Sequence, residues 1–493
     1  MEQKAHVREF LQQFIVATPA SYLAGHLAYN VFGKMLKREL EDSWRKYLEC
    51  HNFSEVETPL MVSKETVEHS GHLEKFTDQI IKTKSGAEFR LDKLIEEETG
   101  QAFNSFNTEA IISLIESLNL TSQKEDIFRI PAPDGEGKVV WEEKNLMFLT
   151  NNGVALRPET AISTFSILND LYHQGGYPIR IFQLGKAFRN EPNPKNLLLR
   201  MREFAQLEVQ LIFDDKCLGV GPVDGVLQSP LSFPVLNEET GEIETLTTEE
   251  LLGSGRLYES ELIYLFQLLQ GWIQEFLQQI PGAGPLKIRY VQHPHEELTF
   301  YAKDGWDLEL YLDGFGWSEV AGIHNRGTHD LTQQSKYHNL CVEHPPKVYE
   351  LAIGIDRLLY TLIDWYYLKF TKGTKDDHGK KLKTVFQLPP KLAPIKVAVL
   401  PLLKNKEALV VVAREVELQL RRYFRTVYLE TGSVGNRYLR AGNQGIPYCV
   451  TIDFQTIETT DTDRTVTVRE RDSEEQVRVP IVELVFHFFK IFS

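Results

Sequence analysis

The segment from Ile179 to Phe213 reads IRIFQLGKAFRNEPNPKNLLLRMREFAQLEVQLIF, and this stretch decides the fold. Two strand-like runs, Ile179 to Phe188 and Glu203 to Phe213, flank a polar loop that contains Pro192 and Pro194. Apolar, aromatic and β-branched residues favour strands, and prolines interrupt them. The segment therefore predicts an antiparallel hairpin with a long tip.

The tip of this hairpin carries side chains that suit a nucleotide. Arg189 can form paired hydrogen bonds with a phosphate, and Glu191 can accept a hydrogen bond from an amino group on a base. Phe204, on the returning strand, offers a flat apolar face on which a ring can stack. On the charge pattern alone, a surface hairpin with incidental ion pairs explains these residues at least as well.

Two other segments carry charged residues next to predicted helices. Glu350 to Arg357 contains Gly354, which permits close backbone approach, and the apolar helical run Leu358 to Trp365 follows it. Leu156 to Thr160 enters another helix, where a carboxylate suits either the positive end of the helix or a bound ammonium group. An ordinary helix entry explains each segment when it is taken alone.

The remaining pattern predicts a larger part and a smaller C-terminal part. Apolar side chains recur every four residues from Phe32 to Leu48, which indicates one face of a helix. From about residue 395 onward, strands alternate with helices over roughly 100 residues, which is typical of a separate α/β domain. Other predicted elements are a strand over Phe53 to Met61, an irregular insertion over residues 214–254, a helix over Glu259 to Gln279, strands over Leu286 to Val320 and a linker over Leu362 to Pro394.

The bulk composition is that of a globular protein and limits the function classes. The chain has 493 residues, of which 42% are hydrophobic and 25% charged, and its net charge is −15. A negative net charge does not exclude a nucleic-acid partner, because binding depends on local basic faces. The four cysteines form no Cys-x-x-Cys pair, so no zinc site is expected. A charged N-terminus without a signal-like or membrane-spanning apolar run predicts a cytoplasmic protein.

The order of these segments resembles motifs 1, 2 and 3 of class II aminoacyl-tRNA synthetases. Those motifs are a helix and strand ending at Pro59, the hairpin, and Gly354-Ile355-Asp356-Arg357 before an apolar helix. In more detail, the sequence from about Tyr29 to Leu484 is similar to that of the homodimeric glycyl-tRNA synthetase family. The matching text includes Phe89-Arg90-Leu91-Asp92, Leu156 to Ala161, Gly185 to Glu191, Tyr301 to Asp304, Lys391 to Ala398, Gly445 to Thr451 and Thr465 to Asp472.

The resemblance implies an α+β fold. It places a class II antiparallel-sheet catalytic domain with helices over residues 1–392, with insertions at about 75–147 and 214–285, and an α/β anticodon-binding domain over residues 393–493. The implied activity joins glycine to ATP as glycyl-adenylate and then transfers glycine to the 3′ end of tRNA(Gly). The implied partners are ATP, glycine, tRNA(Gly) and a second copy of the chain in a homodimer, with no membrane.

The resemblance also implies roles for individual residues. Arg189 would hold the ATP α-phosphate and the reacting carboxylate, while Phe204 and Arg357 would sandwich the adenine ring. Glu319 would hold Mg²⁺ on the phosphates. The implied ATP-binding set is Arg189, Asn190, Glu191, Leu199, Arg200, Met201, Arg202, Glu203, Phe204, Glu319, Val320, Gly354, Ile355, Asp356 and Arg357. The implied glycine-binding set is Arg90, Glu159, Phe204, Gln206, Glu208, Glu350 and Ala352.

At several of these positions, the chain has a different residue from the one that is usual in the family. Ala352 stands where the family has a serine that helps to line the glycine pocket, and His324 stands where it has alanine. Ile162-Ser163 and Ala205 with Leu207 are further departures. They leave two alternatives, a catalytically inactive accessory subunit that binds nucleic acid and a synthetase for another small amino acid. The complete set of implied ATP-contacting residues favours the glycine enzyme.

Overall fold

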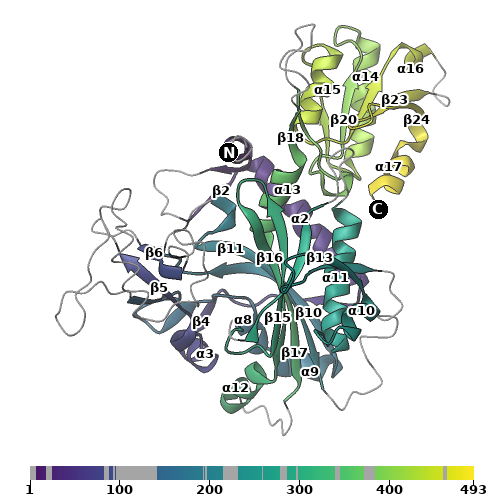
Figure 1. Cartoon of the computed structure of the whole chain (residues 1–493). Helices are drawn as coiled ribbons and strands as arrows, with labels where there is room; N and C mark the ends of the chain where they lie inside the picture. Colours follow the sequence, from purple (N-terminus) through teal and green to yellow (C-terminus); the bar gives the residue numbers. More distant parts are fainter. Residues whose placement is uncertain are drawn as a thin grey trace.

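The computed structural model describes residues 7–17, 25–82, 88–92, 95, 142–192, 194, 197–214, 231–257, 259–277, 286–295, 298–338, 345–370, 383–458 and 464–492. The larger part is built on a nine-stranded sheet with the order β13-β12-β14-β15-β16-β17-β11-β10-β3, and the C-terminal part on a five-stranded sheet. Figure 1 shows the C-terminal part standing beside one end of the larger body.

The predicted hairpin lies within the nine-stranded sheet. Its strands are β10 (Ile179–Phe188) and β11 (Glu203–Phe213), which pair antiparallel from Ile179 opposite Ile212 to Phe188 opposite Glu203. The prediction is therefore confirmed with its boundaries. The sheet continues through β17 (Lys347–Gly354), β16 (Gly316–Gly327), β15 (Asp304–Leu312) and β14 (Ile288–Gln292), each antiparallel to the next.

Long helices pack against this sheet and close the main core. In α2 (Val31–Cys50), Leu36, Leu40, Trp44 and Leu48 are fully buried, which confirms the predicted helix face. The ring of Trp44 stacks on Trp272 of α11 (Ser260–Phe276) with centroids 4.3 Å apart. α13 (Ile355–Tyr366) joins the same core directly after β17. Burial of this continuous apolar surface is what stabilises the larger part.

Two predictions for the larger part are wrong in detail. The strand expected over Phe53 to Met61 is two short strands, β3 (Ser54–Glu55) and β4 (Met61–Ser63), because Pro59 lies between them and cannot donate to a ladder. Within the expected irregular insertion, β12 (Ser232–Leu236) and β13 (Ile243–Thr247) extend the main sheet and α10 (Thr248–Gly253) follows. Each strand has five residues, too few for an alternating pattern to stand out from the turn-forming residues around it. Residues 215–230 of this insertion lie outside the described part.

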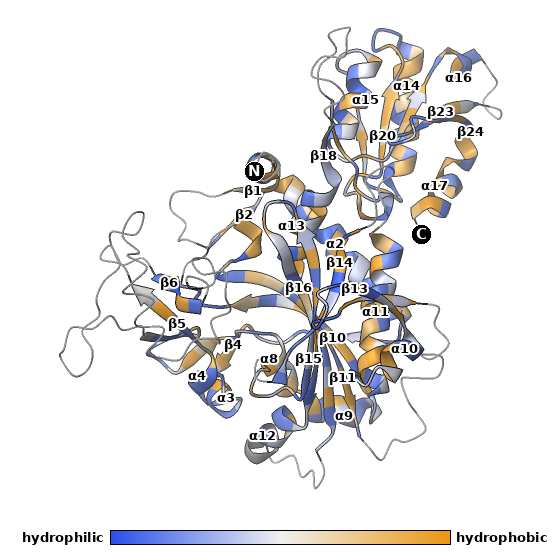
Figure 2. Ribbon diagram, viewed as in Figure 1, coloured by the Kyte–Doolittle hydropathy of each residue, from blue (hydrophilic) through white to orange (hydrophobic). Residues whose placement is uncertain are grey.

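The C-terminal part is the predicted α/β unit. Its sheet has the order β21-β20-β22-β23-β24, in which β20 pairs in parallel with both β21 and β22. Its elements are β20 (Val397–Pro401), α14 (Glu407–Arg421), β21 (Thr426–Tyr428), α15 (Val434–Asn443), β22 (Tyr448–Ile452), α16 (Phe454–Glu458), β23 (Thr465–Glu470), β24 (Gln476–Pro480), η8 (Ile481–Glu483) and α17 (Leu484–Phe492). Figure 2 shows α17 as one of the most hydrophobic helices of the chain.

The connection between the two parts is more regular than the predicted linker. The first five residues of the predicted linker belong to α13. After them, β18 (Tyr367–Phe370) and β19 (Lys383–Phe386) pair antiparallel, and η7 (Pro390–Leu392) follows. Glu39 of α2 then accepts ion pairs from Lys396 at 3.1 Å and Arg425 at 3.3 Å. The two parts are therefore in direct contact through charged side chains.

The other elements lie around the sheet. They are η1 (Leu11–Ile15), β1 (Val16–Ala17), β2 (Ala28–Tyr29), α3 (Lys64–His69), α4 (His72–Lys75), β5 (Thr77–Lys82), β6 (Glu88–Arg90), β7 (Glu142–Asn145), β8 (Phe148–Leu149), β9 (Val154–Leu156), α8 (Ala161–Phe165), α9 (Leu168–Gly175), η3 (Leu197–Leu199) and α12 (His329–His338).

Most of the insertion predicted over residues 75–147 lies outside the described residues. In the parts of the chain that the structure describes, every helix is too short or too polar to cross a lipid bilayer.

Candidate active site

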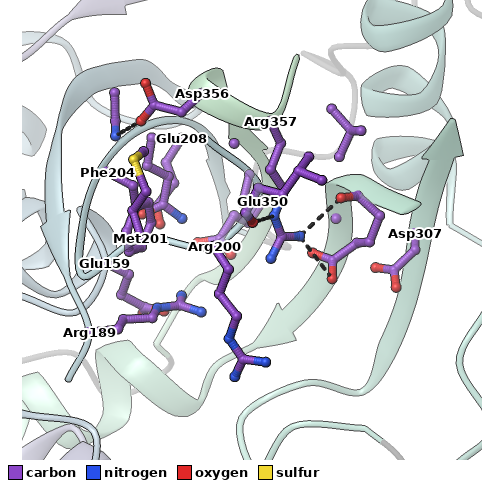
Figure 3. A pocket seen from close by; sticks show the side chains of 18 of the residues that line it. Glu159, Arg189, Arg200, Met201, Phe204, Glu208, Asp307, Glu350, Asp356 and Arg357 are labelled. Atoms are coloured by element: carbon purple, nitrogen blue, oxygen red, sulfur yellow. Dashed lines mark hydrogen bonds and ion pairs between the residues drawn. The ribbon is translucent and has the colours of Figure 1, made fainter. Parts of the chain in front are cut away.

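A cavity of about 290 Å³ opens on the face of the main sheet. Side chains from β11, β15, β16 and β17 line it, together with the hairpin tip and the first turn of α13. The predicted residues that line it are Glu159, Arg189, Glu191, Leu199, Arg200, Met201, Phe204, Gln206, Glu208, Glu319, Val320, Glu350, Ala352, Gly354, Asp356 and Arg357. Figure 3 shows the side chains of 18 of the residues that line it, ten of them labelled.

Five predicted site residues do not line this cavity, namely Arg90, Asn190, Arg202, Glu203 and Ile355. Arg202 donates to the carbonyl of Glu191 at 3.0 Å and so supports the hairpin tip. The Arg90 guanidinium pairs with Asp92 at 2.5 Å and lies 3.7 Å from Asp78. Direct substrate contacts of these five residues therefore stay predictions.

One end of the cavity, called the amino-acid end because the resemblance predicts glycine there, contains three buried carboxylates. Glu159, Glu208 and Glu350 are 6%, 2% and 2% exposed, and they come from three distant segments of the chain. Thr160 donates a hydrogen bond of 2.5 Å to Glu208, and His72 lies 3.5 Å from Glu159. Buried carboxylates need a compensating charge. This end is therefore suited to a small cation such as an ammonium group.

Arg326 supplies the compensating charge and was missed in the sequence. It is 0% exposed and donates to Glu350 at 3.0 Å, to Glu159 at 3.1 Å and to Asp330 at 2.8 Å. Its guanidinium carbon also lies 3.9 Å from the centre of the Tyr301 ring. In the sequence, the one sign of this role is that Asp330 follows Arg326 by four residues at the entry to α12. Pairs of opposite charge at this spacing are common on exposed helices, so the sign is weak.

The three carboxyl groups differ in their affinity for a proton. Burial alone would raise the pKa of Glu159, but the charges of Arg326 and His72 lower it strongly. Burial raises the pKa of Glu350 to about 7 against the opposing charge of Arg326. Burial and the neighbouring charge of Glu350 raise the pKa of Glu208. The cavity thus contains one carboxyl group with a lowered pKa beside two with raised pKa values, which a bound cation would help to ionise.

The other end of the cavity, called the nucleotide end because the resemblance predicts ATP there, is built from more exposed groups that pair with one another. Arg357 donates to the backbone of Leu199 at 3.2 Å and lies 3.3 Å from the carboxylate of Glu319. Their side chains are 38% and 52% exposed. Arg200 donates to Glu191 at 2.6 Å. In this structure, therefore, the predicted nucleotide-binding side chains form ion pairs with one another.

Arg189 lies between the two ends. Its guanidinium carbon is 5.4 Å from the centre of the Phe204 ring, and it donates to the backbone of Pro158 at 3.1 Å. Its charge contributes to the lowered pKa of Glu159 at the amino-acid end. It also adds to the effect of Arg357, which lowers the pKa of Glu319 at the nucleotide end. One cationic group thus acts on both halves of the cavity.

Asp356 connects α2, the hairpin and the start of α13 beneath the cavity. It accepts hydrogen bonds from Lys37 of α2 at 2.5 Å, from the backbone of Ala205 on β11 at 2.6 Å, and from the hydroxyl of Tyr29. Asp356 is 2% exposed. The acid therefore fixes the relative positions of α2, the hairpin and the start of α13 without facing bulk solvent.

The acidic side chains at the nucleotide end fit a metal ion carried by phosphates. Among the described residues, no group of three or more His, Cys, Asp or Glu side chains is arranged to hold a metal by itself. Mg²⁺ commonly binds one or two carboxylates together with substrate phosphates. Glu319, which is half-exposed and faces the cavity, meets that requirement.

Comparison with known proteins gives a consistent result over nearly the whole chain. The Anticodon binding domain model matches residues 396–488. Glycine–tRNA ligase of Thermococcus gammatolerans is 32% identical, with 93% of this chain and 92% of that protein covered. Glycine–tRNA ligase of Pyrococcus furiosus is 31% identical, with 93% of each chain covered.

Solved structures show the same fold at lower sequence identity. The Giardia lamblia prolyl-tRNA synthetase in complex with prolyl-adenylate has a TM-score of 0.56 and 14% identity, and the match covers 98% of this chain and 75% of that one. The prolyl-tRNA synthetase from Cryptosporidium parvum complexed with L-proline and AMP has a TM-score of 0.54. These likenesses confirm the predicted class II fold, and the sequence comparisons show that this chain belongs to the glycine–tRNA ligase family.

Proposed function

We propose that the chain activates glycine with ATP as glycyl-adenylate and transfers the glycyl group to the 3′ end of tRNA(Gly). The observation that carries this proposal is that Arg189 lines one cavity together with three buried carboxylates and with the side chains of Phe204 and Arg357. An ammonium group suits the first end, and an aromatic ring with phosphates suits the second. The two reacting groups would therefore meet beside one arginine.

The proposed chemistry needs position and charge rather than a protein nucleophile. The glycine carboxylate attacks the α-phosphorus of ATP in line, and pyrophosphate leaves. Arg189 stabilises the negative charge that builds on the α-phosphate, while Glu159, Glu208 and Glu350 hold the ammonium group. The terminal ribose hydroxyl of tRNA then attacks the glycyl carbonyl, and AMP leaves.

Nucleotide binding requires the existing ion pairs to exchange partners. Arg357 would leave Glu319 to cover the adenine ring opposite Phe204 and reach the γ-phosphate. Glu319 would then hold Mg²⁺, which neutralises phosphate charge when it is bound. Glu191 would exchange Arg200 for the amino group of the base. Arg357 and Glu319 are 38% and 52% exposed, and ion pairs between such groups contribute little energy in water. Arg200 and Glu191 are less exposed, at 28% and 12%, so their exchange depends more on the new hydrogen bond to the base.

We also propose that the chain forms a symmetric homodimer through the face that carries β4. Leu60 and Met61 are 40% and 66% exposed on this face, which is unusual for large apolar side chains next to each other. Trp44 lies on α2, the helix that resembles motif 1, but it is buried against Trp272 and is not available for an interface. We expect light scattering to show a dimer at micromolar concentration, and Met61→Glu to shift it toward monomer. A stable monomer for the parent protein would contradict the proposal.

The decisive test of function is ATP–pyrophosphate exchange measured separately with each of the twenty amino acids. We expect exchange with glycine, followed by aminoacylation of tRNA(Gly). Exchange with another small amino acid alone would favour the alternative specificity that Ala352 and His324 leave open. No exchange with any amino acid by a folded, ATP-exposed protein would favour the accessory subunit.

A further inference from the structure

His324 occupies a position from which it can control access to the amino-acid end. On β16, Gly322 lies opposite Ala352 of β17, and His324 lies opposite Glu350. Side chains two residues apart on a strand share one face of the sheet. All four positions line the cavity, as this alternation requires. His324 is therefore part of the same wall as Glu350 and Ala352.

The imidazole ring lies across neighbouring glycines instead of standing away from the sheet. A Cβ atom added to Gly322 would lie 2.6 Å from Cε1 of His324, and one added to Gly305 would lie 3.2 Å from its Cδ2. Gly305 is directly opposite His324 on β15. The ring thus covers the space that side chains at both positions would fill. It extends over Gly322 toward the row that contains Ala352.

The polar atoms of the ring support a packing role in an uncharged state. Nδ1 is buried without a hydrogen-bond partner among the described residues, and it lies 3.8 Å from a carboxylate oxygen of Glu350. Burial, and then the charge of Arg326, lower the pKa of His324 to about 4. A neutral ring can lie beside a bound ammonium group without repelling it. The ring therefore adds bulk to this wall without adding positive charge at neutral pH.

We propose that His324 is a specificity-determining residue that fills the space beside Ala352 and so excludes amino acids with a side chain. This inference rests on the proposed function, because it concerns the amino acid that the same cavity activates. Glycine differs from its nearest competitors by lacking a side chain, so exclusion must come from close packing. Forcing an extra methyl group into a packed site typically costs about 1–3 kcal/mol. Ala352 and Gly322 have small side chains or none, and the imidazole ring of His324 fills the space that a larger side chain at Gly322 would occupy.

The test is exchange kinetics with glycine and alanine on the parent protein and on His324→Ala, His324→Ser and His324→Phe. We expect the two small variants to raise the alanine-to-glycine ratio of kcat/KM by about 10-fold to 200-fold, the range that one methyl-sized difference produces. His324→Phe keeps the bulk and removes both nitrogens, so we expect it to keep the parent ratio. His173→Ala, on the exposed surface of α9, is the matched control.

The outcomes separate this inference from the proposed function. A role limited to folding would lower kcat/KM for both amino acids equally, and an unchanged ratio in a folded small variant would overturn the inference. A His324→Phe protein that loses discrimination as His324→Ala does would overturn the packing explanation. If the parent protein gave no glycine-dependent exchange at all, the proposed function itself would fail.

Discussion

The two ends of the cavity use the same kinds of charged side chain in opposite ways. At the amino-acid end, Arg326 is 0% exposed and pairs with Glu350 of β17 and with Glu159, which precedes α8. At the nucleotide end, Arg357 and Glu319 are 38% and 52% exposed and pair across the opening. The first network is assembled by folding, whereas under the proposed function the second exchanges its partners when ATP enters.

This difference follows from the environment of each ion pair. Removing one partner of a buried pair leaves a charge without solvent or a counter-ion, which costs far more than the pair itself contributes. A half-exposed pair can exchange its partner for water or phosphate at little cost. A preformed amino-acid end beside a rearranging nucleotide end suits a small rigid substrate next to a large, highly charged one.

The largest expected effect comes from replacing the central arginine of the buried network. Arg326→Met removes the partner of three carboxylates, and we expect a loss of about 3–5 kcal/mol in the free energy of unfolding. The matched change at the other end, Arg357→Met, should cost no more than about 1 kcal/mol. Urea denaturation of both variants measures the contrast, and equal losses would contradict the distinction between the two ends.

The next effect concerns rate rather than stability. Arg189→Gln removes the cation that faces both ends, and we expect glycine-dependent pyrophosphate exchange to fall about 10²-fold to 10³-fold. Its stability should remain near that of the parent, because its hydrogen bond to Pro158 is part of an open cavity wall. Exchange within twofold of the parent would show that Arg189 does not act on the reacting phosphate.

A smaller effect should appear in the pH dependence of glycine use. Burial raises the pKa of Glu350 to about 7, so below that pH the empty cavity holds a proton that the glycine ammonium must displace. We expect kcat/KM for glycine to fall by up to about tenfold per pH unit below 7. In the Glu350→Gln variant, kcat/KM for glycine should be low and should depend less on pH.

The sign of the linked stability effect is opposite to that of binding. The folded-state pKa of Glu350 lies above its ordinary value, so the folded state binds more protons between these two pKa values. The contribution of Glu350 to stability is therefore largest at low pH and is lost as pH rises through about 7. Thermal unfolding of the parent and Glu350→Gln between pH 5 and 8 would reveal it, and identical pH trends would contradict the assignment.

The smallest effect is expected at Ala352. Ala352→Ser adds one hydroxyl group beside the ammonium site, and a neutral hydrogen bond contributes about 0.5–1.5 kcal/mol. Glycine binding should therefore tighten by no more than roughly tenfold, with discrimination against alanine unchanged. Exchange kinetics with both amino acids measure this. A much larger gain would mean that Ala352, rather than the carboxylates, limits glycine binding.

Local patterns in the sequence predicted the elements that carry most of the site. The strands of the hairpin were predicted with the boundaries that the structure shows, because each has a continuous strand-forming run bounded by turn residues. The buried face of α2 followed from its four-residue apolar spacing. Family resemblance then identified Arg189, Glu191 and Phe204, which the charge pattern alone could not distinguish from surface residues.

The sequence by itself therefore determined the fold class, the order of the elements and most of the residues around the cavity. Only the tertiary structure decided that Arg326 joins Glu159 to Glu350, that Trp44 stacks on Trp272, and that His324 lies over Gly322. Periodicity reports which side of one element is apolar. Contacts between charges depend on strand order and register, which are set by packing over the whole sheet.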